Sequence, residues 1–173
     1  FRSAPREDVE VSEALLPGEA PEAYVVRVAC AKATHGARLL SERQLVPQPL
    51  LSADTTLDFD GEIIGKPGDE NEATRILTRL SGRSHRVLTA VAMTHGTHLE
   101  HVLSVSTVHF RDLSKDEIHR YVLSGEPLDK AGAYAIQGYA AIFVTEIHGS
   151  HSGIVGLPLC ETAQLLRRFG CLV

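Results

Sequence analysis

The sequence lacks tryptophan altogether, contains a single methionine and has only three cysteines, Cys30, Cys160 and Cys171. Their number is odd, they lie far apart, and no Cys-x-x-Cys pair occurs. These features argue against a disulfide scaffold and against a structural zinc site, and they favour a reducing compartment.

Long apolar runs are also absent. No window approaches the roughly 18 consecutive apolar residues that a membrane span requires, so an integral membrane protein is excluded. The start of the sequence is neither apolar enough nor long enough to be a signal peptide. We therefore expect a cytoplasmic protein.

Aromatic residues make up only 5% of the chain, and the formal net charge is −5. Because the sequence has no basic stripe and few aromatics for base stacking, we do not expect a stable nucleic-acid complex. A small anionic substrate remains compatible, since a few lysines focused in a cleft outweigh the net charge.

The chain has 173 residues, 43% hydrophobic and 23% charged, which suits one soluble globular domain covering residues 1–173. The first twenty residues are expected to form a loop or short strand. Periodicity and capping signals predict helices over residues 20–40 (with an interruption at Gly36), 71–80, 114–125 and 157–169. Strands are predicted over residues 50–57, 86–94, 99–110 and 140–147. This pattern predicts an α/β fold with a central mixed, twisted sheet flanked by helices.

Asp54 is the first candidate for chemistry. It lies in a hydrophobic strand and is followed by two hydroxyl residues, Thr55 and Thr56, so it is well placed to face a cleft. Taken alone, an acid at the end of a strand is more often a cap of a turn. Lys66 changes this balance, because the tight-turn signal Asp60-Gly61 would return it beside Asp54. Such a pair is either a surface ion pair or a phosphate clamp beside a water-activating acid.

Three further residues could belong to the same site. Lys32 lies among small residues on a predicted helix, where it either snorkels to solvent or faces an anion. Glu13 precedes that helix and is either solvated or shares a cation with Asp54. Gln137 has the paired donor and acceptor that could read the edge of a base, although a structural amide is the commoner role.

The sequence contains nine histidines, but their spacing does not favour a metal site. His95, His98 and His101 follow a spacing that suits neither a helix face nor a closed zinc set, so a solvated hairpin tip around Gly96 is the better interpretation. We expect His85 to be a hydrogen-bonded structural residue or a cleft contact. Covalent catalysis is not supported, because no serine or cysteine occurs in a strand–turn–helix nucleophile setting.

Seven motifs in this sequence resemble, in order, those of the Maf family of nucleoside triphosphate pyrophosphatases, which is named after septum formation. They are Ala29-Cys30-Ala31-Lys32-Ala33, Ala53-Asp54-Thr55, Gly65-Lys66-Pro67, Leu-Ser-Gly-Arg-Ser-His at 80–85, Ser-Gly-Glu-Pro-Leu-Asp-Lys-Ala-Gly at 124–132, Ile136-Gln137-Gly138 and Val-Gly-Leu-Pro-Leu at 155–159. The form Ala-Tyr-Ala-Ile-Gln-Gly at 133–138 is similar to the subgroup that acts on dTTP and UTP.

The resemblance implies hydrolysis of a pyrimidine nucleoside triphosphate to the monophosphate and pyrophosphate, an activity that cleans the nucleotide pool, in a Maf/ITPase-like fold with a nucleotide cleft. Asp54 would be the general base, and it would share a Mg²⁺ or Mn²⁺ ion with Glu13. Lys32 and Lys66 match polyphosphate-binding lysines, and Thr55 and Gln137 match positions tied to the choice of base. A homodimer is compatible with the resemblance.

One departure from the family pattern favours an alternative function. The family begins with a strand, a Ser-x-Ser-Pro-Arg-Arg loop and a helix, and by alignment Phe1 falls after them. Ser3-Ala4-Pro5-Arg6 lies too close to Glu13 to be that loop. If these elements are absent, the chain would instead be a catalytically impaired protein that binds nucleotides or regulates cell division through a partner.

Overall fold

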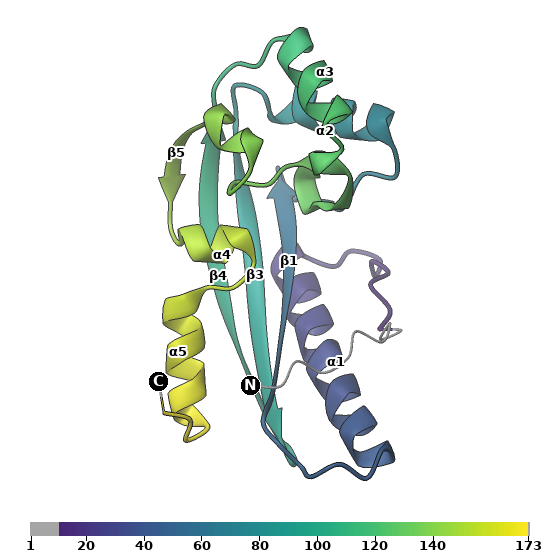
Figure 1. Ribbon diagram of the computed structural model, residues 1–173, viewed down its shortest axis with the longest axis vertical. Coiled ribbons are helices and arrows are strands. Elements are labelled where there is room, and N and C mark those ends of the chain that lie inside the picture. The colour runs from purple at the N-terminus through teal and green to yellow at the C-terminus, as the bar shows by residue number, and fades with distance from the viewer. Residues whose placement is uncertain (1–10, 173) are drawn as a thin grey trace.

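The computed structural model describes residues 11–172, which form one five-stranded sheet in the order β2-β1-β3-β4-β5 with helices packed around it (Figure 1). The strands are β1 (Leu50–Phe59), β2 (Glu62–Ile64), β3 (Ser84–His95), β4 (His98–Phe110) and β5 (Val144–His148). The α-helices are α1 (Pro21–Glu42), α2 (Glu70–Leu80), α3 (Lys115–Leu123), α4 (His151–Val155) and α5 (Leu159–Arg168). Three 3₁₀ segments, η1 (Glu126–Asp129), η2 (Ala131–Ala133) and η3 (Tyr139–Phe143), lie between α3 and β5. The predicted fold class, a single sheet flanked by helices, is confirmed.

The strand directions differ from the mixed sheet that we expected. Every pairing among the described strands is antiparallel. Tight hairpins account for β1–β2 and β3–β4, and the chain segment through α2 returns β3 to the other side of β1 in the reverse direction. A parallel neighbour requires a crossover connection, and none joins two adjacent strands within residues 11–172.

The hairpin between β1 and β2 forms where the sequence predicts it. Asp60 and Gly61 both adopt positive φ, 56° and 85°, as a type I′ turn requires. The short strand β2 pairs only with Leu57, Asp58 and Phe59 of β1. Within the described part of the chain, the first half of β1 therefore has no strand partner on this side, and its edge is open to the site described below.

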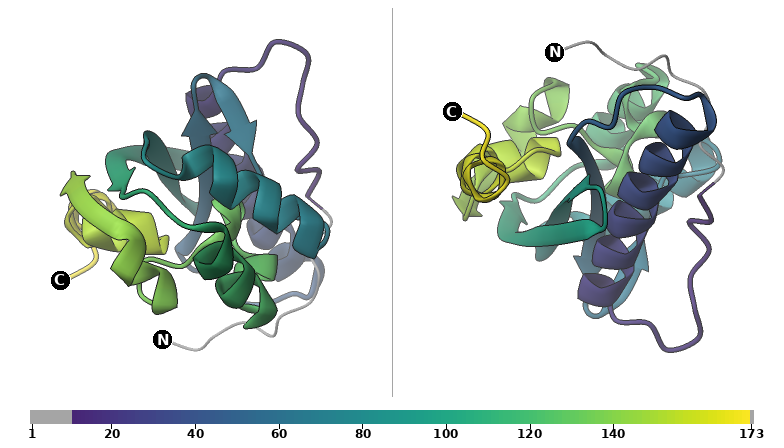
Figure 2. Two further views of the ribbon diagram at one scale, coloured as in Figure 1. Left: turned by 90° about the horizontal axis from the view of Figure 1, so that it is seen from above. Right: turned by 90° about the horizontal axis from the view of Figure 1, so that it is seen from below.

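The two faces of β3 pack against different helices because side chains alternate along a strand. Leu88, Ala90 and Ala92 pack against α1, whereas Val91 and Met93 pack against α5. Figure 2 shows α1 and α5 on opposite sides of the sheet.

A third core cluster lies at the other end of the sheet, under α2 and α3 (Figure 1). Its aromatic centre is Phe110, which contacts His85, Tyr134 and Phe143 edge to face. Helix α2 buries one face there, as its spacing predicts, through Ala73, Ile76, Leu77 and Leu80. Edge-to-face packing favours one arrangement of these rings, so the cluster fixes the segments that surround the site.

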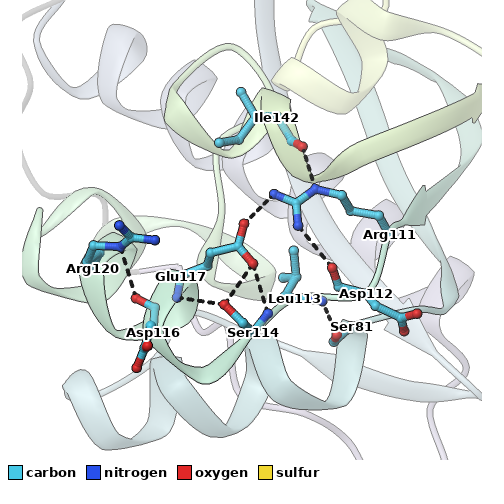
Figure 3. Close-up of polar contacts among 9 residues, drawn as sticks. All are labelled: Ser81, Arg111, Asp112, Leu113, Ser114, Asp116, Glu117, Arg120 and Ile142. Carbon is cyan, nitrogen blue, oxygen red and sulfur yellow. Dashed lines mark hydrogen bonds and ion pairs between the residues drawn. The ribbon is translucent and has the colours of Figure 1, made fainter.

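The predicted capping box begins α3 (Figure 3). Ser114 Oγ accepts a hydrogen bond from the Glu117 amide at 3.3 Å, and Glu117 Oε2 accepts one from the Ser114 amide at 2.9 Å. Arg111 donates to Glu117 Oε1 at 2.7 Å and to the carbonyl of Ile142 at 3.1 Å. The Arg111 hydrogen bond, with the Ser114 donors, lowers the pKa of Glu117 to about 2. This network ties α3 to η3.

Several element boundaries differ from the predictions. Helix α1 continues through Gly36, since a single glycine is tolerated in a helix of this length. The run predicted as a strand over residues 140–147 begins as the 3₁₀ segment η3, and only Val144–His148 is a strand. Residues 11–20 form the expected loop, and the expectation for residues 1–10 lies outside the described part. None of the described helices is both long enough and apolar enough to cross a bilayer.

Candidate active site

A cavity of about 260 Å³ opens beside the free edge of β1. Four of the predicted site residues line it, namely Asp54, Thr55, Lys66 and Gln137. Gly156, at the end of α4, and Tyr134, which follows η2, also line the cavity. Residues from four separate parts of the sequence therefore meet at one site.

The other two candidates, Lys32 and Glu13, join Asp54 directly. Lys32 Nζ donates to Asp54 Oδ1 at 2.7 Å and forms an ion pair with Glu13 Oε1 at 2.6 Å. The Asp54 side chain is 11% exposed, whereas that of Glu13 is 52% exposed. One ammonium thus lies between a mostly buried carboxylate and a solvated one.

This arrangement raises the pKa of both Asp54 and Lys32, for different reasons. Burial raises the pKa of Asp54 above its usual range, and Lys32 opposes that rise without cancelling it. Burial works against the ammonium form of Lys32, but hydrogen bonds to Asp54 and Glu13 outweigh it and raise the pKa of the lysine. Lys32 is therefore a fixed positive charge beside a carboxylate that burial makes more basic.

Asp54 and Thr55 point to opposite faces of β1. Asp54 pairs with Ala90, on the face that α1 covers, and Thr55 pairs with Thr89, on the face that α4 covers. Because the cavity lies at an open strand edge, it reaches both faces. A ligand that spans this edge would have the acid and the lysines at one end and Thr55 at the other.

The hydrogen-bonding partners of Thr55 decide whether its hydroxyl acts as a donor or as an acceptor towards a ligand. Thr89 Oγ1 donates to the carbonyl of Gly153 at 2.7 Å, which uses its only hydrogen. The 2.8 Å contact between Thr55 Oγ1 and Thr89 Oγ1 must then have Thr55 as the donor. Thr55 thus presents hydrogen-bond acceptor lone pairs to a ligand.

Lys66 follows β2, and the hairpin brings it to the cavity as predicted. Its position is supported by a hydrogen bond from the amide of Gly132 to the carbonyl of Gly65 at 3.0 Å. Lys66 is exposed; its charge opposes the rise in the pKa of Asp54 and adds to the lowering of the pKa of Asp129. It is free to meet an anion that enters the cavity.

Two charged residues that the sequence analysis did not single out also line the cavity. Asp129 and Lys130 form an ion pair with each other at its rim. The lysine lowers the pKa of Asp129 through their hydrogen bond. Both lie in the motif at 124–132, but nothing in their spacing shows that they face Lys66.

His85 supports the cavity from behind. It is buried, and its Nε2 lies 2.8 Å from the hydroxyl of Tyr134. Burial, with a small contribution from His109, lowers the pKa of His85 to about 4. It is therefore a neutral, hydrogen-bonded structural residue at pH 7, one of the two roles that the sequence allowed.

The His85 pKa predicts a loss of stability in mild acid. Above pH 6.5 the imidazole is neutral in both states; below it, the unfolded chain takes up a proton that the folded chain resists down to about pH 4. Between pH 7.5 and pH 5.0 this group alone should lower the free energy of unfolding by about 2 kcal/mol. Denaturant titrations of the wild type and of His85→Phe at both pH values measure it. An equal pH effect in the two proteins would contradict the assignment.

The remaining histidines and the cysteines lie elsewhere. His95, His98 and His101 are exposed at the β3–β4 hairpin, as predicted, and His98 pairs with Glu100. Cys30, Cys160 and Cys171 are free thiols. Within residues 11–172, no three histidine, cysteine or acidic side chains lie together as a metal-binding group.

Comparison with known sequences shows the family of this chain. A family model described as Maf-like protein matches residues 3–169. The chain belongs to the Maf family. It is 58% identical over 170 residues to a protein of Dechloromonas aromatica (strain RCB) named dTTP/UTP pyrophosphatase, with 98% of this chain and 85% of that protein covered. Proteins with the same name from Aromatoleum aromaticum and Cupriavidus pinatubonensis are 55% and 54% identical, and the aligned regions cover 83% and 81% of those proteins.

Five of the segments that resemble family motifs meet at this cavity or beside it. The Maf motifs at 29–33, 53–55, 65–67, 124–132 and 136–138 each contribute to the cavity or to the ion-paired group beside it. The motif at 80–85 supplies His85, which holds Tyr134 in the cavity wall.

Proposed function

We propose that this protein hydrolyses dTTP and UTP to the nucleoside monophosphate and pyrophosphate. The observation that carries the proposal is the approach of two lysines to one mostly buried carboxylate. Lys32 is bonded to Asp54, and Lys66 lines the same cavity. The names of the relatives, dTTP/UTP pyrophosphatase, support the reaction and the substrates.

In this proposal Asp54 acts as the general base. It removes a proton from a water molecule whose oxygen bonds to the α-phosphorus, while the bond from that phosphorus to the bridging oxygen breaks and pyrophosphate leaves. A carboxylate with a raised pKa is a better base than an ordinary one, and burial raises the pKa of Asp54. Lys32 and Lys66 would neutralise the triphosphate charge that otherwise repels the attacking oxygen.

Glu13 and Asp54 also fit a divalent cation. Both already present a carboxylate oxygen to one cation, the ammonium of Lys32, at 2.6 and 2.7 Å. Mg²⁺ favours such sites, with one or two carboxylates and the phosphates of the substrate as ligands, and Mn²⁺ accepts the same oxygens. Glu13 and Asp54 would hold the ion, which when bound supplies stabilisation of charge on the phosphate oxygens.

Thr55 and Gln137 are the proposed base-reading residues. Uracil and thymine carry an N–H between two carbonyl groups, whereas cytosine carries an acceptor nitrogen at that position. Thr55 offers an acceptor, because its own hydrogen is donated to Thr89. Gln137 is exposed in the cavity and offers both a donor and an acceptor. An acceptor on Thr55 suits the N–H of uracil and thymine and not the acceptor nitrogen of cytosine, so it favours UTP and dTTP over CTP.

The experiment is a product assay with dTTP, UTP, CTP and GTP in the presence of Mg²⁺ or Mn²⁺. We expect pyrophosphate and the monophosphate from dTTP and UTP, with no orthophosphate before a pyrophosphatase is added. Orthophosphate as the first product would contradict cleavage at the α–β bond. Equal turnover of all four nucleotides would contradict the proposed reading of the base.

Other expectations are part of the same proposal. The single sheet and the family match over residues 3–169 support one Maf-like domain. A pyrimidine nucleoside triphosphate is the proposed partner. The homodimer and the cytoplasmic location stay predictions, which sedimentation and cell fractionation would test.

A further inference from the structure

Gln137 is carried by a short turn. The amide of Gly138 donates to the carbonyl of Ala135 at 3.0 Å, so Ile136 and Gln137 are the two central residues of a β-turn. The segment belongs to no helix or strand, and Gln137 is exposed. The position of its amide in the cavity therefore depends on what holds the two ends of the turn.

One carboxylate, that of Glu126, reaches both ends. Its Oε1 accepts a hydrogen bond from the Tyr121 hydroxyl at 2.9 Å, and that hydroxyl accepts one from the amide of Ala135 at 3.2 Å. Its Oε2 accepts a hydrogen bond from the amide of Tyr139 at 3.2 Å. Residues 135 and 139 flank the turn, so Glu126 and Tyr121 close a clamp around it.

The surroundings of the clamp fit this arrangement. Tyr121 is 1% exposed and contacts Phe143 edge to face, which fixes the direction of its hydroxyl. The ring of Tyr139 stacks on Tyr121. At Gly138 a Cβ atom would overlap the Glu126 carboxylate, so only glycine lets the acid approach the backbone this closely.

Both side-chain oxygens of residue 126 must accept a hydrogen bond, because each faces a donor. Since the Tyr121 hydroxyl accepts from Ala135, its single hydrogen goes to Glu126, and the Tyr139 amide is always a donor. Glutamine at this position would point its NH₂ group at one of these two donors. The same size of side chain would then break one arm of the clamp.

We propose that Glu126 is a positioning residue for base recognition, acting through Tyr121 and the Tyr139 amide to fix the turn that presents Gln137. This inference rests on the proposed function, because it assumes that Gln137 reads the base. It adds a residue that would never touch the substrate to the set that decides which nucleotide is hydrolysed.

The kinetic test compares Glu126→Gln and Tyr121→Phe with the wild type, using UTP and CTP. We expect the KM for UTP to rise about tenfold, kcat to change less than about threefold, and the preference for UTP over CTP to fall about tenfold. The matched control is Glu117→Gln, which weakens the capping box and the Arg111 bond; among the described residues, Glu117 forms no hydrogen bond or ion pair with residues 135–139. It should lower the melting temperature and leave the nucleotide preference unchanged.

Amide hydrogen exchange supplies a measurement that does not depend on activity. In both variants, Ala135 and Tyr139 should exchange faster than in the wild type, while α2 stays protected. Unchanged exchange would overturn the clamp, and faster exchange with an unchanged UTP preference would overturn its role in base recognition. If the wild type hydrolyses no nucleotide, the proposed function fails, and the exchange measurement alone decides whether the clamp exists.

Discussion

Asp54→Asn should abolish pyrophosphate release, with a loss of about 10³-fold in kcat and little change in melting temperature. Asparagine has the size of aspartate and keeps an oxygen that can accept the 2.7 Å hydrogen bond from Lys32. It cannot take a proton from water, because an amide is not a base near neutral pH. The change therefore removes the proposed chemistry and leaves the packing of a side chain that is only 11% exposed.

Two controls make this result specific. Asp116→Asn, an exposed acid near the start of α3, should keep wild-type turnover. Calorimetry should show that Asp54→Asn still binds dTTP through the lysines of the site. A variant with wild-type turnover would remove Asp54 from the mechanism. Binding of dTTP by the wild type without any turnover would instead favour the alternative of a nucleotide-binding protein that regulates a partner.

The part of the site predicted correctly from the sequence is the part made by local structure. The Asp60-Gly61 turn has a strong signal, because few residues adopt positive φ at both positions, and it returns Lys66 along β1 towards Asp54. The capping box of α3 and the buried face of α2 are local in the same sense. Each depends on residues within a few positions of one another, so the pattern is sufficient.

The part that could not be predicted depends on contacts between distant segments. Whether Lys32 meets Asp54 or solvent is decided by how α1 lies on the sheet, and the sequence left both outcomes open. The clamp of Glu126 joins three segments through one carboxylate, with no spacing that marks it. The direction of the strands is also a tertiary property, which is why a mixed sheet could not be distinguished from the antiparallel one.

The first part of the strand predicted over residues 140–147 was wrong for a different reason. An apolar run such as residues 140–147 has no clear period, so it is compatible with a strand or with a short helix. In the structure, Ala140 and Phe143 are buried and Ala141 and Ile142 are exposed, a spacing of three that suits a 3₁₀ segment. Arg111, which lies outside this run, donates a hydrogen bond to the Ile142 carbonyl and so stabilises the 3₁₀ segment.

Gly132→Ala should lower the free energy of unfolding by about 3 kcal/mol, which would shift the melting temperature by about 10 °C. Gly132 adopts a φ of 73°, which costs a residue with a side chain about 1–2 kcal/mol. Its Cβ would also overlap the Cδ1 atom of Leu57, which is only 1% exposed, so this buried side chain would have to shift out of its packed position. Because η2 packs on β1 at this point, the change should also disturb the cavity.

Gly96→Ala separates the two contributions, because Gly96 has a similar φ of 63° and no atom within 4 Å of its ideal Cβ. It should cost only about 1 kcal/mol, the backbone part alone. In a Leu57→Ala background the overlap with Cδ1 is gone and only the 3.3 Å approach to the Cβ of residue 57 remains, so the additional cost of Gly132→Ala should fall towards the value measured at Gly96. An equal cost of Gly132→Ala with and without Leu57 would show that backbone conformation alone, and not the contact between η2 and β1, requires glycine at this wall of the cavity.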